Sequence, residues 1–280
     1  MRNRRRGPLN DIADHVQAWI SEAIRTAPAG HVPLLFLSGP QGSGKSTALA
    51  EAIGGLRNHI AGASIDDFYL THAERMDLAR QASPLFRTRG PPGTHDLALL
   101  GHTIEALCMA EKKTLTTLPV FDKLADDRAP ARRWRKFKGR PDAIVIEGWL
   151  MGALPDPDPV PDYASVPPLN AVEAEDRTGD WRRLQDEALS GPYAELWNLA
   201  DGFCHILPPS FDCVQNWRLE QEATLWAEKD KAMPAERREW VLRFIQHYEQ
   251  ITRRMIDGHR RPGAEIHIDA ARNVIKTSDC

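Results

Sequence analysis

The sequence predicts an α/β protein in which a parallel sheet carries helices on both faces. Three observations indicate this class. Short, continuously apolar runs alternate with stretches of helical periodicity, two of the runs end in acidic residues, and one is followed by a glycine-rich turn. The chain has 280 residues, of which 42% are apolar and 27% are charged. This length and composition are typical of one large globular unit with a substantial core.

The first predicted elements are a helix and a buried strand. Apolar residues recur at helical spacing from Ile12 to Ile24, and Pro28 and Gly30 end this helix. The run Val32–Ser38 is short and continuously apolar, as expected for a strand that is buried on both faces. A glycine-rich turn comes next, and the second predicted helix, which is closed by a pair of glycines, follows it.

The remaining elements continue the alternation. We expect three further strands and then a last one, in the order Ala63–Ile65, Ala143–Glu147, Phe203–Leu207 and Glu265–Asp269. Helical patterns cover Asp96–Glu111, resume at Asp180, and form a long amphipathic stripe from Trp240 to Met255, started near Pro234 and stopped by Gly258. Such a stripe is typical of core packing. The Pro- and Asp-rich segment 152–168 cannot be regular structure, because proline removes a donor and disfavours helix before it.

We interpret segment 152–168 as a surface excursion rather than a linker. The predicted organisation is therefore an N-terminal basic tail and helix over residues 1–30, followed by one α/β domain over residues 31–280. The four cysteines show no CxxC pairing, as in proteins with reduced thiols. No window approaches the roughly 18 apolar residues that a membrane span needs. We expect a soluble, cytoplasmic protein without a membrane partner; the sequence leaves the oligomeric state open.

The formal net charge of −3 argues against nucleic acid as the main partner. The charge is uneven, however. The N-terminus carries Arg2, Arg4, Arg5 and Arg6, and a second basic cluster runs from Arg128 to Arg140. The latter includes aromatic residues, so nucleic-acid binding through it remains an alternative. We favour a loop that is solvated or faces a small anion.

One segment has the pattern of a phosphate-binding loop. Gly39–Ser46 satisfies G-x-x-x-x-G-K-[ST], and the motif stands between a predicted buried strand and a predicted helix, as it must. Its glycines let successive N–H groups point inward, Lys45 can reach the β- and γ-phosphates, and the Ser46 hydroxyl can ligate Mg²⁺. The predicted nucleotide-binding residues are Gly39, Pro40, Gln41, Gly42, Ser43, Gly44, Lys45, Ser46 and Thr47. The sequence therefore predicts binding of a nucleoside triphosphate.

Acidic residues downstream indicate what the phosphate is used for. Asp66 and Asp67 follow a predicted strand, where ligands of open α/β sheets collect. One of them can accept the proton of an attacking hydroxyl while the other caps the next turn. Glu147 ends another strand and can serve Mg²⁺ together with Ser46. There is no NKxD motif, and no DxxG motif follows a predicted strand as in GTPases, which favours phosphoryl transfer to a small acceptor.

Several segments resemble, in matching order, the D-glycerate 3-kinase family, a group within the phosphoribulokinase and uridine kinase class of P-loop kinases. They are GPQGSGKST, SIDDFYLTHAER, RGPPGTHD, LPVFDKLADDR and IVIEGWLMG, and then GPYAELWNLAD, NWRLEQE and FIQHYEQITRRM. The likeness runs from about Leu34 to Asp269, and segment 152–168 departs from it. It implies a three-layer P-loop kinase fold with a helical lid. It also implies that ATP, with Mg²⁺, and D-glycerate give ADP and 3-phosphoglycerate.

The resemblance also implies roles for individual residues. Asp66 matches the acid that acts as base, Glu147 matches an acid near magnesium, and Arg218 falls where the class has a lid arginine over the transferring phosphate. With Lys45, Asp66 and Arg218 form the expected catalytic group. Residues expected at the acceptor site are Asp67, Arg89, His95, Asp96, Lys123 and Arg128.

Within that set, a cation is needed for the acceptor carboxylate, and Arg89, Lys123 and Arg128 are the candidates. His95 and Asp96 are the candidates for hydrogen bonds to the acceptor hydroxyls. Two alternatives to a glycerate kinase stay open. One is a related kinase for a nucleoside, pantothenate or a sugar phosphate, and the other is a nucleotide-binding regulator without catalysis.

Overall fold

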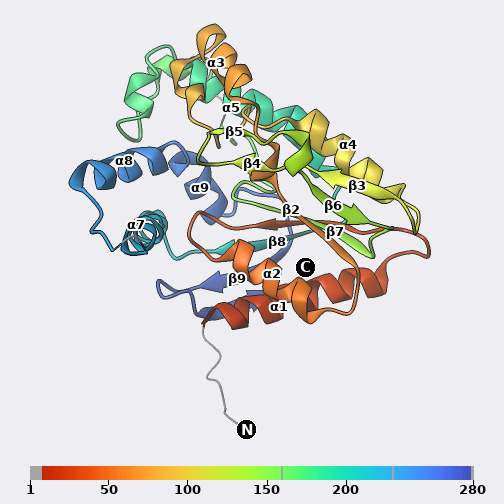
Figure 1. The fold of residues 1–280 in the computed structure, drawn as a ribbon. Coiled ribbons are helices and arrows are strands. Elements are labelled where there is room, and N and C mark those ends of the chain that lie inside the picture. Colours follow the sequence, from red (N-terminus) through yellow and green to blue (C-terminus); the bar gives the residue numbers. More distant parts are fainter. Residues whose placement is uncertain (1–7, 159, 229, 279–280) are drawn as a thin grey trace.

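The computed structural model describes residues 8–158, 160–228 and 230–278 (Figure 1). The predicted α/β class is confirmed. In the described part of the chain the main sheet has the strand order β10-β9-β8-β1-β7-β2, and all its neighbours pair in parallel except β10, which is antiparallel to β9. Its strands are β1 (Leu34–Ser38), β2 (Ile60–Ser64), β7 (Ala143–Gly148), β8 (Gly202–Leu207), β9 (Ala264–Ile268) and β10 (Val274–Ser278). The central strands β1 and β7 are buried along their whole length, as their continuous apolar runs predict.

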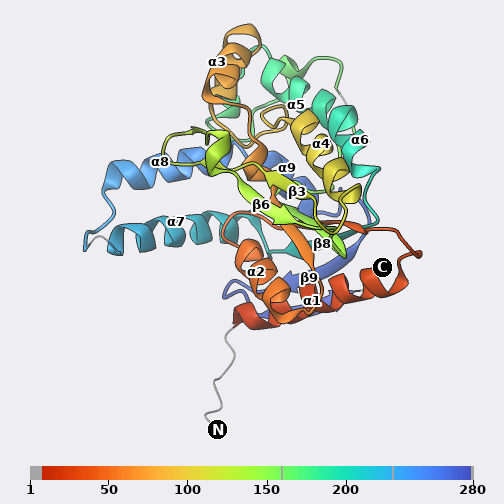
Figure 2. The same ribbon diagram turned by 45° about the vertical axis from the view of Figure 1, so that its right-hand side comes forward.

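Helices cover both faces of this sheet (Figures 1 and 2). On one face lie α1 (Pro8–Thr26) and α2 (Lys45–Gly55), which pack against each other. On the other face lie α4 (Leu97–Cys108), α5 (Asp180–Ser190), α6 (Pro192–Trp197) and α9 (Glu249–Ile256). The Trp197 ring of α6 meets the Phe36 ring of β1 edge-on, with 5.4 Å between the centroids. This contact anchors the second helix layer directly on the sheet.

The remaining helices flank the carboxyl ends of the strands. They are α3 (His72–Gln81), α7 (Phe211–Ala227) and α8 (Ala235–Gln246), of which α7 and α8 pack side by side. The single long helix expected between Pro234 and Gly258 is wrong, because the chain breaks into α8 and α9 at Tyr248. Tyr248 is 3% exposed and its hydroxyl donates to the Arg89 carbonyl, which fixes the bend. Trp240 of the predicted core stripe is 44% exposed.

Two small two-stranded sheets and one strand of the main sheet escape the sequence analysis. They are a two-stranded sheet of β3 (Leu115–Leu118) and β6 (Arg135–Lys138), and the hairpin of β4 (Phe121–Asp122) and β5 (Asp127–Arg128) that lies between these two strands in the chain. Glu265–Asp269 is not the last strand, since β10 follows it. Strand β6 is hidden in the basic cluster because its charged side chains are exposed at an edge. Arg133 and Arg135 of this cluster form ion pairs with Asp122 and Asp67, so their charge is met within the chain.

Segment 152–168 contains one short 3₁₀ turn, Tyr163–Ser165, and otherwise no regular element among its described residues. It is held from beneath by Arg182, a 3% exposed side chain that donates to the carbonyls of Tyr163 and Val166. The basic tail predicted around Arg2 to Arg6 lies outside the described residues. No helix of the described chain is long and apolar enough to cross a membrane.

Candidate active site

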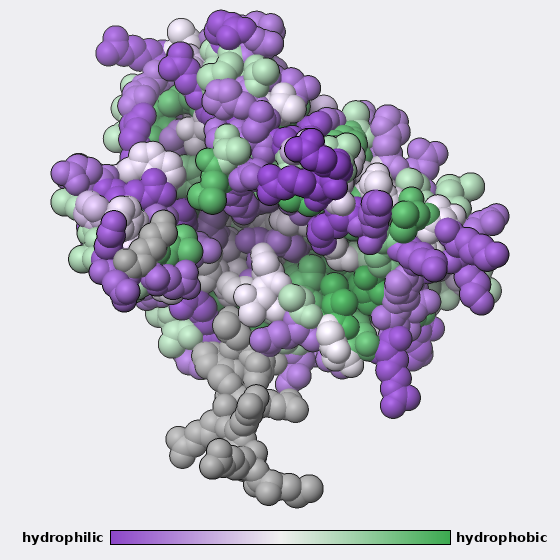
Figure 3. All heavy atoms as spheres, viewed as in Figure 1, coloured by the Kyte–Doolittle hydropathy of each residue, from purple (hydrophilic) through white to green (hydrophobic). Residues whose placement is uncertain are grey.

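A cavity of about 1660 Å³ opens at the carboxyl ends of β1, β2 and β7. The glycine-rich turn after β1, the turn after β2, the β4–β5 hairpin and helices α7 and α8 all line it. In the space-filling view this face is mostly hydrophilic and is hollowed near its centre (Figure 3). Because single small-molecule sites usually measure about 300–1,000 Å³, the cavity has room for two ligands.

The glycine-rich turn forms one wall. Gly42 and Gly44 have φ angles of +76° and +86°, a conformation that other residues rarely adopt. A Cβ at Gly42 would also lie 2.5 Å from the Cβ of Trp217 on α7, so this turn packs closely against that helix. Of the predicted nucleotide-binding residues, those that line the cavity are Gln41, Gly42, Gly44, Lys45, Ser46 and Thr47. The others, Gly39, Pro40 and Ser43, are buried beneath the turn.

Glu147 joins this wall through the register of the sheet. It lies opposite Leu37 of β1 and Ser64 of β2, at the point where these strands end. The Ser46 hydroxyl donates to Glu147 Oε1 at 2.8 Å, and Lys45 Nζ lies 3.8 Å from Oε2. Glu147 is 5% exposed, and its Oε2 has no hydrogen-bond partner in the described chain.

This arrangement fits a magnesium ion. A hydroxyl oxygen and an unsatisfied carboxylate oxygen lie next to each other beside the phosphate cradle, and both are oxygen ligands of the kind that Mg²⁺ takes. Mg²⁺ at nucleotide sites is held by one or two protein groups, with phosphate and water completing the shell. Ser46 and Glu147 can supply those protein groups.

Asp66 stands in the 3₁₀ turn Ile65–Phe68 directly after β2, on the cavity wall. Its Oδ1 accepts a hydrogen bond from the Tyr69 hydroxyl at 2.7 Å, and its Oδ2 accepts one from Lys123 Nζ at 2.8 Å. Burial alone would raise the pKa of Asp66. The ammonium groups of Lys123 and Lys45 and the two hydrogen bonds outweigh burial and hold this pKa below its ordinary value. Asp66 is therefore ionised at neutral pH and can accept a proton.

Asp67 has different partners, although it also touches the cavity. Its carboxylate accepts the Phe121 N–H at 3.2 Å and forms an ion pair with Arg135, 3.2 Å away. These bonds tie the turn after β2 to β4 and β6. Burial raises the pKa of Asp67, which these bonds counteract. The contacts of Asp67 thus tie the turn to neighbouring strands rather than cap it, and the expected roles of Asp66 as base and of Asp67 at the acceptor stay predictions.

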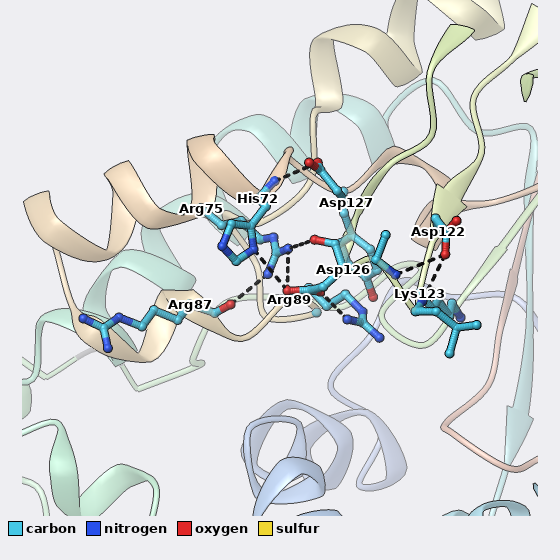
Figure 4. Close-up of polar contacts among 12 residues, drawn as sticks. His72, Arg75, Arg87, Arg89, Asp122, Lys123, Asp126 and Asp127 are labelled. Carbon is cyan, nitrogen blue, oxygen red and sulfur yellow. Dashed lines mark hydrogen bonds and ion pairs between the residues drawn. The ribbon is translucent and has the colours of Figure 1, made fainter. Parts of the chain in front are cut away.

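Two of the predicted acceptor cations, Lys123 and Arg89, line the cavity near Asp66. Arg89 forms an ion pair with Asp126 through Nη1, and its guanidinium lies 5.5 Å from the centre of the Phe121 ring. Asp126 also binds Arg75, which is fully buried (Figure 4). These contacts fix the β4–β5 hairpin against α3 and place both cations on one wall.

Arg128, His95 and Asp96 are not among the residues that line the cavity. Asp96 accepts the N–H of Leu99 at the start of α4 and pairs with Arg128, which also donates to the Tyr69 carbonyl. The His95 ring stacks on the Tyr69 ring at 4.6 Å, and burial lowers the pKa of His95 to about 4. The structure therefore places these three residues behind Tyr69, and their expected contact with an acceptor stays a prediction.

Arg218 projects from α7 on the opposite side of the cavity. Its guanidinium forms an ion pair with Glu222 at 3.1 Å and lies 5.9 Å from the centre of the Phe244 ring. Arg237 of α8 donates to the same carboxylate at 2.7 Å. Glu222 is thus shared by two arginines, and the loss of one of them would leave it paired.

Sequence reasoning missed several side chains of the wall. They are Tyr69, Arg75, Asp126, Trp149, Arg237, Tyr248 and Arg272. Arg272 comes from the β9–β10 turn and donates through Nε to the Gly42 carbonyl at 2.7 Å. The quoted segments SIDDFYLTHAER, LPVFDKLADDR, IVIEGWLMG and FIQHYEQITRRM contain Tyr69, Arg75, Asp126, Trp149 and Tyr248, so a signal was present for these five. Arg237 and Arg272 lie outside those segments.

We expect the glycine at position 90 to be indispensable for the wall that carries Arg89. Its φ is +116°, and a Cβ there would overlap the Tyr248 hydroxyl, which is bonded to Arg89. We expect Gly90→Ala to lower the free energy of unfolding by at least about 2 kcal/mol and to raise the KM of the acceptor. Chemical denaturation and steady-state kinetics measure the two effects.

Gly101 in α4 supplies the matched control. A Cβ at this position meets nothing within 4 Å, so Gly101→Ala should raise the free energy of unfolding by about 0.5–1 kcal/mol through helix propensity. If Gly90→Ala proves as stable as Gly101→Ala, the packing of Tyr248 against residue 90 is not as described.

No protein-family model matches the chain, but the similar proteins of known sequence are all named as kinases. An uncharacterized kinase of Schizosaccharomyces pombe, mug58, is 30% identical over 257 residues, which cover 86% of each chain. A probable ATP-dependent kinase of Saccharomyces cerevisiae, TDA10, is 32% identical over 235 residues, covering 76% of this chain and 74% of that protein. The chloroplastic D-glycerate 3-kinase of Arabidopsis thaliana is 31% identical over 233 residues, 78% of this chain and 48% of that protein.

Among solved structures, the D-glycerate 3-kinase of Cryptococcus neoformans shares the fold. Its TM-score is 0.74, and the match covers 97% of this chain and 99% of that one. The sequence identity is 22%, so this likeness bears on the fold alone. It places the sheet and its helices in the architecture of a P-loop kinase.

Proposed function

This chain belongs to the D-glycerate 3-kinase family of P-loop kinases and is an ATP-dependent phosphotransferase, and on that premise we propose that its acceptor is D-glycerate. The reaction would transfer the γ-phosphoryl group of ATP to the 3-hydroxyl and give ADP and 3-phosphoglycerate. The single observation that carries the proposal is that Asp66, Lys123 and Arg89 line the cavity beside the phosphate cradle. A general base and two cations on one wall suit a small hydroxy acid.

The nucleotide half of the site follows from the glycine-rich turn. Its N–H groups and the start of α2 would hold the phosphates, and Lys45 would lie along the β- and γ-phosphates. Ser46 and Glu147 would hold Mg²⁺, which when bound neutralises charge on the phosphate oxygens. Lys45 Nζ lies 3.8 Å from the Glu147 carboxylate, and a bound phosphate would be a second anionic partner for this lysine.

The proposed acceptor half of the site follows from the charge of D-glycerate and from its short length. D-glycerate carries a carboxylate and two hydroxyls within three carbons, so the cations that hold its carboxylate must lie close to the base. Lys123 is bonded to Asp66, and Arg89 presents a guanidinium on the same wall. Arg89 donates to Asp126 through Nη1, so the other nitrogens of its guanidinium can donate to a carboxylate.

The proposed chemistry is an in-line displacement. The 3-hydroxyl oxygen attacks the γ-phosphorus, a new P–O bond forms, and the bond between the γ-phosphorus and the β,γ-bridging oxygen breaks. The hydroxyl proton passes to Asp66, and ADP leaves with the electron pair of the broken bond. Arg218 would turn from Glu222 toward the transferring group, while Arg237 keeps Glu222 paired. Positioning and the exclusion of water supply most of the rate.

A panel of acceptors tests the proposal. Purified protein with Mg²⁺ and ATP is assayed for ADP release with D-glycerate, a nucleoside, pantothenate and a sugar phosphate. We expect kcat/KM for D-glycerate to exceed that for each of the others by at least about 10³, because those acceptors do not place a carboxylate between the two cations. Clear turnover of another member with none of D-glycerate would contradict the proposal. If the protein binds ATP but phosphorylates none of these acceptors, the alternative of a nucleotide-binding regulator without catalysis is favoured.

A further inference from the structure

The Lys123 ammonium group, one of the two cations proposed for the acceptor carboxylate, is bonded directly to the base. Lys123 Nζ donates to Asp66 Oδ2, and the Tyr69 hydroxyl donates to Oδ1. Each oxygen of the carboxylate thus already accepts a hydrogen bond. A hydroxyl group that approaches Oδ2 from the cavity meets the ammonium group beside that oxygen, and the proton affinity of the carboxylate is reduced while the ammonium is in place.

These two partners differ in their freedom to move. Tyr69 is 3% exposed, and its ring is stacked on His95. The Lys123 side chain is 61% exposed, and four methylene groups separate its ammonium from the backbone. The lysine can therefore leave Asp66 by side-chain rotation, whereas Tyr69 stays.

The backbone that carries Lys123 is fixed. Arg75 donates to the Asp126 carbonyl and pairs with the Asp126 carboxylate at 2.9 Å, and it also donates to the Arg87 carbonyl (Figure 4). Asp126 stands in the hairpin with a φ of +53°, held by these contacts. In Figure 4 the side chain of Arg87 points away from this cluster. Movement of the lysine thus requires no movement of the hairpin.

An acceptor carboxylate offers the lysine a second anion. The attraction of Asp66 raises the pKa of Lys123, and the repulsion from Arg89 opposes it, so the two cations are close enough to affect each other. A carboxylate between them would relieve this repulsion and compete with Asp66 for the ammonium group. A neutral alcohol or a water molecule brings no such charge.

We propose that Lys123 is a specificity-determining residue that blocks Asp66 until an anionic acceptor draws its ammonium group away. The inference rests on the proposed function, in that Asp66 is the base and the acceptor is a hydroxy acid. Lys123 then has two effects. It favours acceptors that carry a carboxylate beside the hydroxyl, and it suppresses attack by water, which would convert ATP to ADP, phosphate and a proton.

The test compares Lys123→Met with the wild type and with two controls. Lys123→Arg keeps a cation, and Lys113→Met removes an exposed lysine from the turn between α4 and β3. Each protein is assayed for ADP release with D-glycerate, with glycerol and without an acceptor. Glycerol is D-glycerate with the carboxylate replaced by a neutral CH₂OH group. Lys123 is mostly exposed, so its replacement leaves the fold intact.

For Lys123→Met we expect kcat/KM with D-glycerate to fall by about tenfold or more, because one partner of the carboxylate is lost. Turnover of glycerol and ATP hydrolysis without acceptor should both rise, on the order of tenfold, since Asp66 is freed. Lys123→Arg should retain most of the discrimination, and Lys113→Met should match the wild type. If Lys123 only binds the acceptor carboxylate, Lys123→Met will lower turnover of D-glycerate but leave turnover of glycerol and the rate of ATP hydrolysis unchanged. This result would overturn the inference.

The hydrolysis arm separates this inference from the proposed acceptor. It needs no acceptor, so it reports on the Lys123–Asp66 pair even if D-glycerate is not a substrate. If the wild type does not phosphorylate D-glycerate, the proposed function is contradicted. If the rate of ATP hydrolysis without acceptor is the same in Lys123→Met as in the wild type, the blocking role of Lys123 is contradicted.

Discussion

Replacing Asp66 with asparagine is expected to lower kcat by about 10³, within the 10²–10⁴ that a positioned general base contributes. Asparagine keeps the size of the side chain and can still accept the hydrogen bond from Tyr69, but it cannot take up the proton of the attacking hydroxyl. The dissociation constant of ATP, measured by calorimetry, should change by less than about threefold. The loss then belongs to the chemical step.

The neighbouring acid is the matched control. Asp67 is bonded to Phe121 and Arg135, and these bonds hold the turn after β2. We expect Asp67→Asn to lower thermal stability and to cost less than tenfold in kcat. A larger loss of kcat in Asp67→Asn than in Asp66→Asn would reverse the assignment of the two acids.

Replacing Arg218 with glutamine is expected to lower kcat by about 10²–10³, as the loss of one preorganised donor to a charged transition state does. Arg218 stands on α7 next to Trp217, and Trp217 packs against Gly42 of the phosphate-binding turn. The Arg218 guanidinium lines the cavity next to this turn, and on the proposed function it would lie over the transferring group. Single-turnover kinetics at saturating ATP would isolate the effect on transfer.

Arg237→Gln is the control for this variant, because Arg237 shares the Glu222 carboxylate with Arg218. Removing either arginine leaves Glu222 with one partner, although only Arg237 reaches this carboxylate from the other helix. We expect Arg237→Gln to cost less than tenfold in kcat. Equal losses in the two variants would mean that Arg218 acts only by packing α7 on α8.

Local signals in the sequence predict the parts of the site that depend on short stretches of chain. The glycine-rich turn and Asp66 each follow a strand, and Glu147 stands at the end of one. The register of β1, β7 and β2 then brings them to one edge of the sheet, as expected for parallel strands. Lys123 and Arg89 were expected at the acceptor site from family resemblance. The structure places them on the cavity wall near Asp66.

Contacts between distant segments could not be predicted in this way. His95 and Asp96 lie in a motif that the resemblance places at the acceptor site, yet they pack behind Tyr69, because His95 stacks on the Tyr69 ring and Asp96 caps α4. The break between α8 and α9 depends on a bond from Tyr248 to Arg89, 159 residues away along the chain. Hydrophobic periodicity carries no record of such bonds.

The most direct test of the account is to identify the product. Purified protein is incubated with ATP, Mg²⁺ and D-glycerate, and the reaction is followed by ³¹P NMR. The account predicts one new phosphomonoester signal that grows with ADP and is split into a triplet by the two protons of the CH₂ group at carbon 3. A doublet, from phosphate on carbon 2, would contradict the assigned hydroxyl. Release of ADP and inorganic phosphate alone, or an unchanged spectrum, would contradict phosphoryl transfer to D-glycerate.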